Sequence, residues 1–329
     1  LAKMLQGQTG RTSAALTDAD VPRTFTGFLE WVGITPRPGQ LEFIRVAYDG
    51  LQPVDVGLAE RIFGRLDFEN LPMGLRAVIV GVCGGRAGKS FLLVAARLVW
   101  GMLVRDLSPL ALGEEAAATV VAPREELRQQ VINFGLGVMC MRPELQQRLI
   151  LPQGQAPEDK PSWFGIYRKD FKREVMFEGQ VAARGGMGVR GKWHTDLALD
   201  EAAFFRDATY KINDEEIFKA GRPRVLQGGQ LIVNSTPYAK VGLLYELFRA
   251  NLGKPQTALV AHAPTLVLND DPYIREQVAA ERKRDPDNAK QEFDAEFLEA
   301  GTTVFFETTC IEEALTDEPF TLRPGDIVA

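Results

Sequence analysis

The residues most able to do chemistry form a glycine-rich segment that ends in a lysine and a serine. Positions 83–90 read Cys-Gly-Gly-Arg-Ala-Gly-Lys-Ser, directly after a strand-like apolar run. Such a turn lets backbone amides approach phosphate oxygens, and a following helix adds the partial positive charge of its N-terminus. We expect three glycines to shape this phosphate loop: Gly84, Gly85 and Gly88. Lys89 would contact the β- and γ-phosphates of ATP, and the Ser90 hydroxyl would bind Mg²⁺.

This loop has two unusual positions. Cys83 stands where the first glycine of the pattern is usual, so a glycine turn that binds nothing is the alternative interpretation. Arg86 lies inside the loop, where it is either a built-in arginine finger that stabilises γ-phosphate charge or a surface residue in a salt bridge.

A second chemical signal is an apolar run that ends in two acids. Positions 195–201 read Thr-Asp-Leu-Ala-Leu-Asp-Glu. Ligands bind at the carboxyl ends of parallel strands, so we expect Asp200 to hold Mg²⁺ through water and Glu201 to orient or deprotonate the attacking water. The alternative is a strand followed by an acidic helix cap. Asp196 falls at the start of the run, where a structural role is expected.

Alternating strands and helices must position these residues. Strands are predicted over 77–82, 117–122, 195–199 and 230–234, and helices over 40–51, 56–65, 89–104 and 125–137. Residues 151–181 are expected to form an inserted antiparallel hairpin, and residues 271–298 a charged helical region. This order predicts an α/β fold of three layers around a largely parallel sheet, the phosphate-loop NTPase architecture of the ASCE type.

The composition excludes several classes of protein. The 329 residues contain three cysteines and two histidines, which argues against a zinc site and for reduced thiols. No apolar run reaches the ~18 residues of a membrane span, and no signal peptide is expected. The net charge of −6 argues against a free-standing nucleic-acid binder, but allows local basic patches or DNA contact after oligomer assembly.

The order of the motifs over residues 35–310 resembles the large terminase subunits of tailed bacteriophages. The phosphate loop is followed by an Arg-Gly segment at 185–191, by the Asp-Glu strand, and by Asn-Ser-Thr-Pro at 234–237. The likeness continues through Ala-Pro-Thr at 263–265, Asn-Asp-Asp-Pro at 269–272, Asp-Pro at 285–286 and 291–297. Each motif alone is weak to moderate evidence, but their order and spacing together are specific.

The resemblance implies an ATPase motor that pumps double-stranded DNA into a viral procapsid in the host cytoplasm, with no role in a membrane. The implied partners are the portal protein, the small terminase subunit and further copies of the chain in a ring, commonly a pentamer. ATP and Mg²⁺ would be the cofactors.

The resemblance also assigns roles to residues outside the two motifs. The segment formed by Asn234, Ser235 and Thr236 would sense loss of the γ-phosphate, with a plain strand ending in a proline turn as the alternative. Gln40 stands where the family has an adenine-contacting glutamine, with an ordinary residue at a helix start as the alternative. Arg184 and Arg190 are candidate arginine fingers, or surface residues.

Two departures from the family pattern matter. Many terminases carry an arginine at the place of Gly85, so the identity of the finger among Arg86, Arg184 and Arg190 stays open. The chain also stops where the first strand of the family's nuclease domain would begin, so we expect no DNA cleavage. The expected organisation is an N-terminal arm over 1–34, an ATPase core over 35–244, and a helical lid and linker over 245–329.

Two functions compete with DNA packaging. A helicase-like translocase shares the glutamine, the phosphate loop and the acids, but should carry a second motor domain. A nucleotide-binding scaffold without turnover should lack one of Lys89, Asp200 and Glu201, all of which are present. For DNA contact, the basic and aromatic segment 167–173 is one candidate and an aggregation-blocking edge strand is its alternative; residues 282–284 are expected to be a solvated face.

Overall fold

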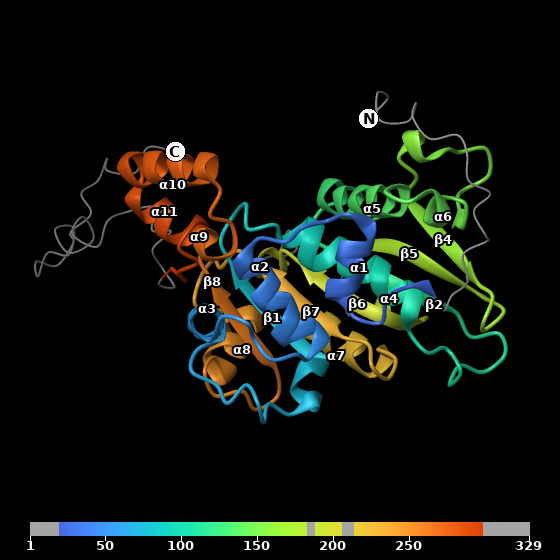
Figure 1. Ribbon diagram of the computed structural model, residues 1–329, viewed down its shortest axis with the longest axis horizontal. Coiled ribbons are helices and arrows are strands. Elements are labelled where there is room, and N and C mark those ends of the chain that lie inside the picture. The colour runs from blue at the N-terminus through green and yellow to red at the C-terminus, as the bar shows by residue number, and fades with distance from the viewer. Residues whose placement is uncertain (1–19, 183–187, 206–213, 299–329) are drawn as a thin grey trace, which may run out of the picture.

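A single eight-stranded sheet organises the molecule, with the strands in the order β3-β4-β5-β2-β6-β7-β1-β8. The computed structural model describes residues 20–182, 188–205 and 214–298 (Figure 1). The strands are β1 (Val78–Cys83), β2 (Ala116–Ala122), β3 (Leu149–Ile150), β4 (Trp163–Arg168), β5 (Arg173–Val181), β6 (Trp193–Asp200), β7 (Leu231–Ser235) and β8 (Leu259–Ala263). The strands from β5 to β8 along this order pair in parallel, and the β3–β4 and β4–β5 pairs are antiparallel.

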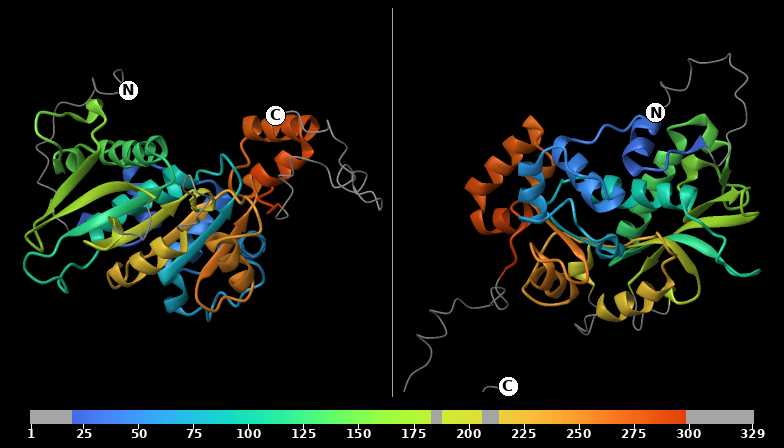
Figure 2. Two further views of the ribbon diagram at one scale, coloured as in Figure 1. Left: turned by 180° about the vertical axis from the view of Figure 1, so that it is seen from behind. Right: turned by 60° about the horizontal axis from the view of Figure 1, so that its bottom comes forward.

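Helices cover both faces of the sheet (Figure 2). They are α1 (Phe25–Val32), α2 (Pro38–Phe43), α3 (Val56–Phe63), α4 (Arg97–Val104), α5 (Glu125–Cys140), α6 (Pro143–Gln146), α7 (Asp214–Gly221), α8 (Leu243–Asn251), α9 (Thr265–Leu268), α10 (Pro272–Arg284) and α11 (Pro286–Glu292). π-Helical turns continue α2 over Ile44–Asp49 and precede α4 over Lys89–Ala96. The predicted three-layer α/β fold is therefore confirmed.

Alternate residues of the same strands pack against the two layers of helices. In β1, Ile79 and Cys83 belong to the core beneath α1 to α5, while Val78, Val80 and Val82 belong to the core beneath α7 and α8. All residues of β1 and β2 are buried. Apolar side chains on both faces are what a central parallel strand requires, which is why these runs are continuous rather than alternating.

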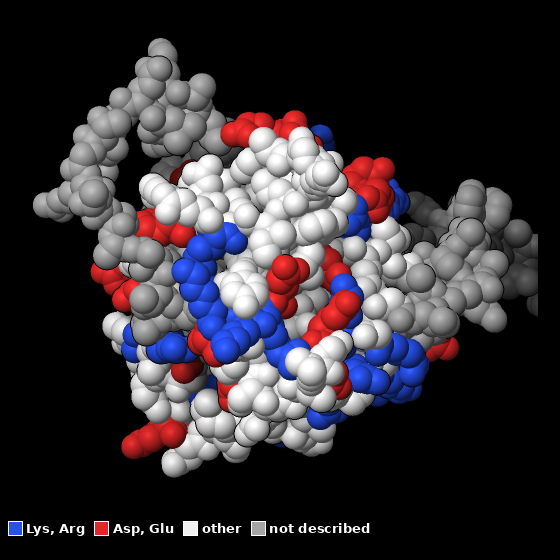
Figure 3. Space-filling view, turned by 90° about the vertical axis from the view of Figure 1, so that its right-hand side faces the viewer, with Lys and Arg blue, Asp and Glu red and all other residues white. Residues whose placement is uncertain are grey.

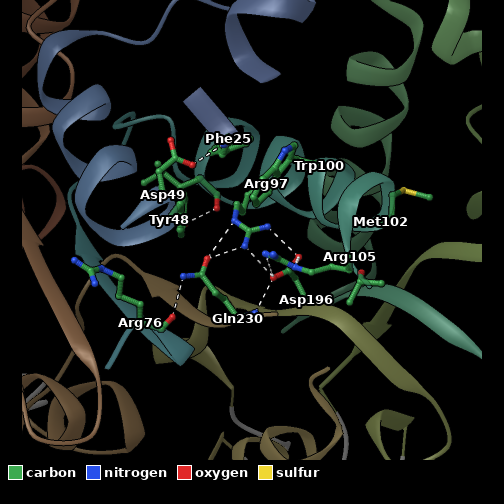
Figure 4. Close-up of polar contacts among 12 residues, drawn as sticks. Phe25, Tyr48, Asp49, Arg76, Arg97, Trp100, Met102, Arg105, Asp196 and Gln230 are labelled. Atoms are coloured by element: carbon green, nitrogen blue, oxygen red, sulfur yellow. Dashed lines mark hydrogen bonds and ion pairs between the residues drawn. The ribbon is translucent and has the colours of Figure 1, made fainter. Parts of the chain in front are cut away.

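A buried charge network ties the start of β6 to α4 (Figure 4). Both Asp196 and Arg97 are fully buried, and two hydrogen bonds of 2.9 and 3.0 Å join the guanidinium to the carboxylate. Arg105 donates a further bond of 3.2 Å to Asp196, and the Gln230 backbone N–H donates one of 2.7 Å. The network gives Asp196 the structural role predicted for it, although Asp196 is the fourth residue of β6 and does not lie at the strand start.

The segment after residue 245 contributes a strand as well as helices. β8 is not predicted from the sequence, and it pairs in parallel with β1 at the edge of the sheet. The predicted helical region 271–298 is helical only as far as Glu292. Residues 293–298 are extended, because the Leu298 N–H donates to the Tyr238 carbonyl (2.8 Å) and the Lys240 N–H to the Leu298 carbonyl (3.0 Å).

Residues before the predicted core also pack into it. The α1 side chains of Phe25, Phe28 and Leu29 are fully buried in the helical layer that covers α4. Within the described residues, no helix combines the length and the apolar character needed to cross a bilayer. The described part of the predicted arm over 1–34 therefore includes a core helix.

Candidate active site

The phosphate loop is a turn of unusual backbone geometry between β1 and the first π-helical turn. Gly88 has φ +88°, a conformation that favours glycine, and an added Cβ would lie 2.7 Å from the Gln40 Nε2 atom, so that this side chain would have to shift. Arg86 also has a positive φ of 60°, a conformation that costs free energy in a residue with a side chain. The loop is therefore held in a shape that local preference alone would not give.

Lys89 lies at the centre of the site. Its side chain is buried, and its ammonium donates to the Cys83 carbonyl oxygen (3.3 Å) and to the Thr236 hydroxyl. The Glu201 Oε1 atom is 3.5 Å away. The loop lysine thus contacts both the acidic motif and the segment after β7, which are far apart in the sequence.

The two acids at the end of β6 differ in environment. Asp200 is 1% exposed, and it accepts a hydrogen bond of 3.1 Å from Asn234 and another from Ser90. Burial and the neighbouring Glu201 raise the pKa of Asp200 to about 6, against the opposing effects of Ser90 and Lys89. A bound divalent cation would compensate the negative charge of this buried carboxylate. The hydroxyl of Ser90 and the carboxylate of Asp200 are also the oxygen ligands that Mg²⁺ prefers.

Glu201 is held at the mouth of the site by the backbone and by two donors. Its φ is +54°, in the left-handed region. The Ser235 hydroxyl donates to its Oε2 atom over 3.1 Å, and the Thr236 backbone N–H donates to the same atom over 3.3 Å. A positive φ in a glutamate at this position is the kind of strain that persists only where the surroundings enforce it.

The three residues of the expected sensing segment are buried between the two motifs. β7 lies between β6 and β1 in the sheet, so Asn234, Ser235 and Thr236 reach the acids on one side and the loop on the other. The Asn234 Oδ1 atom is buried and accepts no hydrogen bond. An unpaired buried oxygen costs free energy, so a donor or cation at this position would stabilise the site.

Gln40 braces the phosphate loop from α2. Its Nε2 atom donates to the Ala87 carbonyl oxygen over 2.9 Å, and its Oε1 atom accepts the Arg37 backbone N–H over 3.0 Å. The side chain is 8% exposed. In this structure, the amide is therefore engaged with the backbone of the chain itself.

Solved structures of phage terminases share this fold. The large terminase ATPase domain of Thermus phage P74-26 aligns with a TM-score of 0.52, at 19% identity over 83% of this chain and 98% of that chain. A single-residue variant of the same domain aligns with a TM-score of 0.51, at 18% identity over the same shares. The HK97 bacteriophage large terminase aligns less well, with a TM-score of 0.48 and 16% identity over 80% of this chain and 56% of that chain.

The chain has the fold of a phage large terminase ATPase domain. No family model matches the sequence, and no curated protein matches it. At these identities the likeness to the terminases establishes the fold, and the assignment of individual residues depends on the geometry described above.

Two of the candidate arginine fingers, Arg86 and Arg190, are in the described residues, and they lie in different parts of the molecule. Arg86 is exposed at the loop, with its carbonyl oxygen held by the Asn269 side chain at 2.8 Å. Arg190 follows Val189, whose carbonyl oxygen lies 3.0 Å from His194 Nε2 near the start of β6. Asp200 is at the other end of that strand, on the order of 20 Å away. Arg190 therefore lies away from the acids of the site, and Arg184 lies outside the described residues.

Thr265 and Glu292, to which the sequence assigned no role, also contact the phosphate loop. The Thr265 hydroxyl donates to the Gly85 carbonyl oxygen over 2.7 Å, and the Gly85 N–H donates to the Glu292 carbonyl oxygen. The Ala-Pro-Thr segment at 263–265 was the signal for the first contact. Glu292 lies in the segment 291–297 that carries part of the resemblance, but its contact with Gly85 arises from the packing of α11, which no local pattern indicates.

The basic hairpin segment 167–173 is largely structural. Arg168 is buried and donates to the Met102 carbonyl oxygen (3.1 Å) and to Asp170. Arg173 donates to the carbonyl oxygens of Leu110 (2.8 Å) and Ala111 (2.7 Å). Lysine and arginine side chains on this end of the molecule are interspersed with acids (Figure 3). These observations favour the edge-strand interpretation over a DNA-contacting one.

Proposed function

We propose that this chain hydrolyses ATP with Mg²⁺ and couples hydrolysis to movement of double-stranded DNA into a viral procapsid. The observation that carries the proposal is the meeting of three motifs at Lys89, whose ammonium contacts Thr236 and lies 3.5 Å from Glu201. Parallel α/β sheets bind their ligands at this edge. The terminase ATPase fold supports the same function.

Each residue has a distinct part in the proposed reaction. Backbone amides around Gly88 and the Lys89 ammonium would bind the phosphates, while Ser90 and Asp200 would hold Mg²⁺, which supplies charge neutralisation when bound. Glu201 would orient the attacking water and accept its proton. Asn234 to Thr236 lie against both acids and the lysine, which fits a segment that responds to loss of the γ-phosphate.

The proposed motor acts as an oligomer on DNA. The position of Arg190 at the far end of β6 fits an arginine finger that enters the site of a neighbouring copy, as in a ring. Such a finger supplied by a second chain contributes about 10³ to 10⁵ in rate. A ring of five copies on the procapsid, bound to the portal protein and assisted by a small terminase subunit, is the assembly in which we propose that it acts.

The proposal is tested by ATP hydrolysis measured against protein concentration, with and without linear double-stranded DNA, for the wild type and Glu201→Ala. We expect a rate that depends on Glu201 and rises with concentration or DNA. ATP binding with a wild-type rate no higher than that of the variant would favour a scaffold without turnover. DNA-stimulated hydrolysis accompanied by strand separation would favour a helicase-like translocase.

A further inference from the structure

The end of α11 and the residues after it connect the phosphate loop with the segment after β7. We call residues 291–298 the closing segment. At its start, the Glu292 carbonyl oxygen accepts the Gly85 N–H, and the Gln291 Nε2 atom donates to the Pro237 carbonyl oxygen over 3.1 Å. At its end, the Leu298 N–H donates to the Tyr238 carbonyl oxygen over 2.8 Å. A movement at Glu292 would therefore be transmitted to the residues directly after Thr236.

The Glu292 side chain faces the phosphate loop. A Cβ added to Gly85 would lie 3.3 Å from both the carbonyl oxygen and the Oε2 atom of Glu292. Burial raises the pKa of the Glu292 carboxyl, Lys89 opposes that rise and Glu201 adds to it. Glu292 is thus a further carboxylate within electrostatic reach of the loop lysine, in addition to Glu201 and Asp200.

Glu201 and Glu292 lie on different structural elements. Glu201 is fixed at the end of a central strand and by donors from Ser235 and Thr236. Glu292 is the last residue of α11, which packs chiefly against α10, away from the main sheet (Figure 1). A γ-phosphate bound to Lys89 would add negative charge beside both carboxylates, and of the two only Glu292 lies on an element outside the main sheet. When a nucleoside diphosphate is bound, the negative charge of a γ-phosphate is absent beside the two carboxylates.

We propose that Glu292 is the residue through which the lid distinguishes a nucleoside triphosphate from a diphosphate. With a diphosphate, the closing segment stays hydrogen-bonded to Gly85. With a triphosphate, repulsion between the γ-phosphate and the Glu292 carboxylate releases that contact and shifts the segment that is bonded to Pro237 and Tyr238. The inference rests on the proposed nucleotide binding and assigns the lid a part in its regulation.

The test compares the affinities of β,γ-imido ATP and ADP, both with Mg²⁺, by titration calorimetry. Three full chains are needed: wild type, Glu292→Gln and Asp287→Asn. The last variant is a matched control, because Asp287 lies on the same helix with its side chain 86% exposed. We expect Glu292→Gln to raise the preference for the triphosphate by about tenfold, within the usual range of coupling between sites. The control should leave the preference unchanged.

A second measurement on the wild type avoids dependence on a variant. Amide hydrogen exchange at Gly85 and Leu298 should accelerate with β,γ-imido ATP and stay slow with ADP. An unchanged preference in Glu292→Gln, or equal protection with both nucleotides, would overturn the role of Glu292 while leaving nucleotide binding intact. If none of the three chains binds either nucleotide, the proposed ATPase function itself is rejected, and this inference with it.

Discussion

The Nζ atom of Lys89 lies 3.5 Å from the Oε1 atom of Glu201, joining the phosphate loop to the acid expected to activate water. The lysine is buried and the glutamate side chain is 20% exposed. Without nucleotide, the pair neutralises two charges that would each be costly near the core. A bound phosphate would take the lysine from Glu201 and leave the carboxylate available to water.

Replacing this carboxylate should separate binding from turnover. We expect Glu201→Gln to lower kcat for ATP by at least about a hundredfold, because a general base typically contributes 10² to 10⁴ in rate. Nucleotide affinity should be retained or tightened, since Lys89 no longer has to leave a charged partner. Phosphate release and titration with a fluorescent ATP analogue measure the two quantities. Normal turnover in the variant would remove Glu201 from the mechanism.

Gln40, which braces the phosphate loop from α2, should strengthen the binding of nucleotides whatever their base. We expect Gln40→Ala to weaken ATP and GTP by a similar factor, about tenfold, because its amide holds the Ala87 carbonyl oxygen at the loop. Gln129→Ala is the control, since that side chain also donates to a backbone carbonyl, at Pro161 (2.9 Å) on a different part of the fold. A loss confined to ATP would show instead that Gln40 reads the adenine base.

The buried network at Asp196 should contribute to stability and not to catalysis. Asp196→Asn removes the charge that compensates Arg97, and breaking such a pair typically costs about 3–5 kcal/mol. Urea unfolding would measure the loss, with the exposed Asp287→Asn as the control. A change below about 1 kcal/mol would mean that Gln230 and the aromatic rings around Arg97 suffice to hold its charge.

Cys83 and Cys140 should react with a thiol reagent at different rates. Burial raises the pKa of Cys83 to about 12, so its reactive thiolate is disfavoured in the folded chain even at pH 9. We expect iodoacetamide to label half-buried Cys140 well before Cys83 in the native protein. Cys83 should become labelled at an ordinary rate once urea unfolds the chain. Mass spectrometry of the peptides gives both rates, and fast native labelling of Cys83 would show that the loop opens readily.

The sequence alone determined the local elements of this protein and the chemistry at their ends. Continuous apolar runs before the glycine turn and before Asp200 predicted buried parallel strands, because only strands covered on both faces tolerate such runs. The glycines of the phosphate loop could also be identified from the sequence, because they meet conformational requirements of the backbone itself. The hairpin was predicted over 151–181 and is formed by β4 and β5 over 163–181, and the structural role of Asp196 was predicted although not its place inside β6.

Only the tertiary structure decided which of these elements meet. The order of the strands places β7 between β6 and β1, and this brings Thr236 to Lys89 although the two are 147 positions apart. β8 was missed because its five residues carry no pattern that separates a short edge strand from a helix. Glu292 was missed because α11 is charged along its length, and only packing against Gly85 distinguishes this carboxylate from its solvated neighbours.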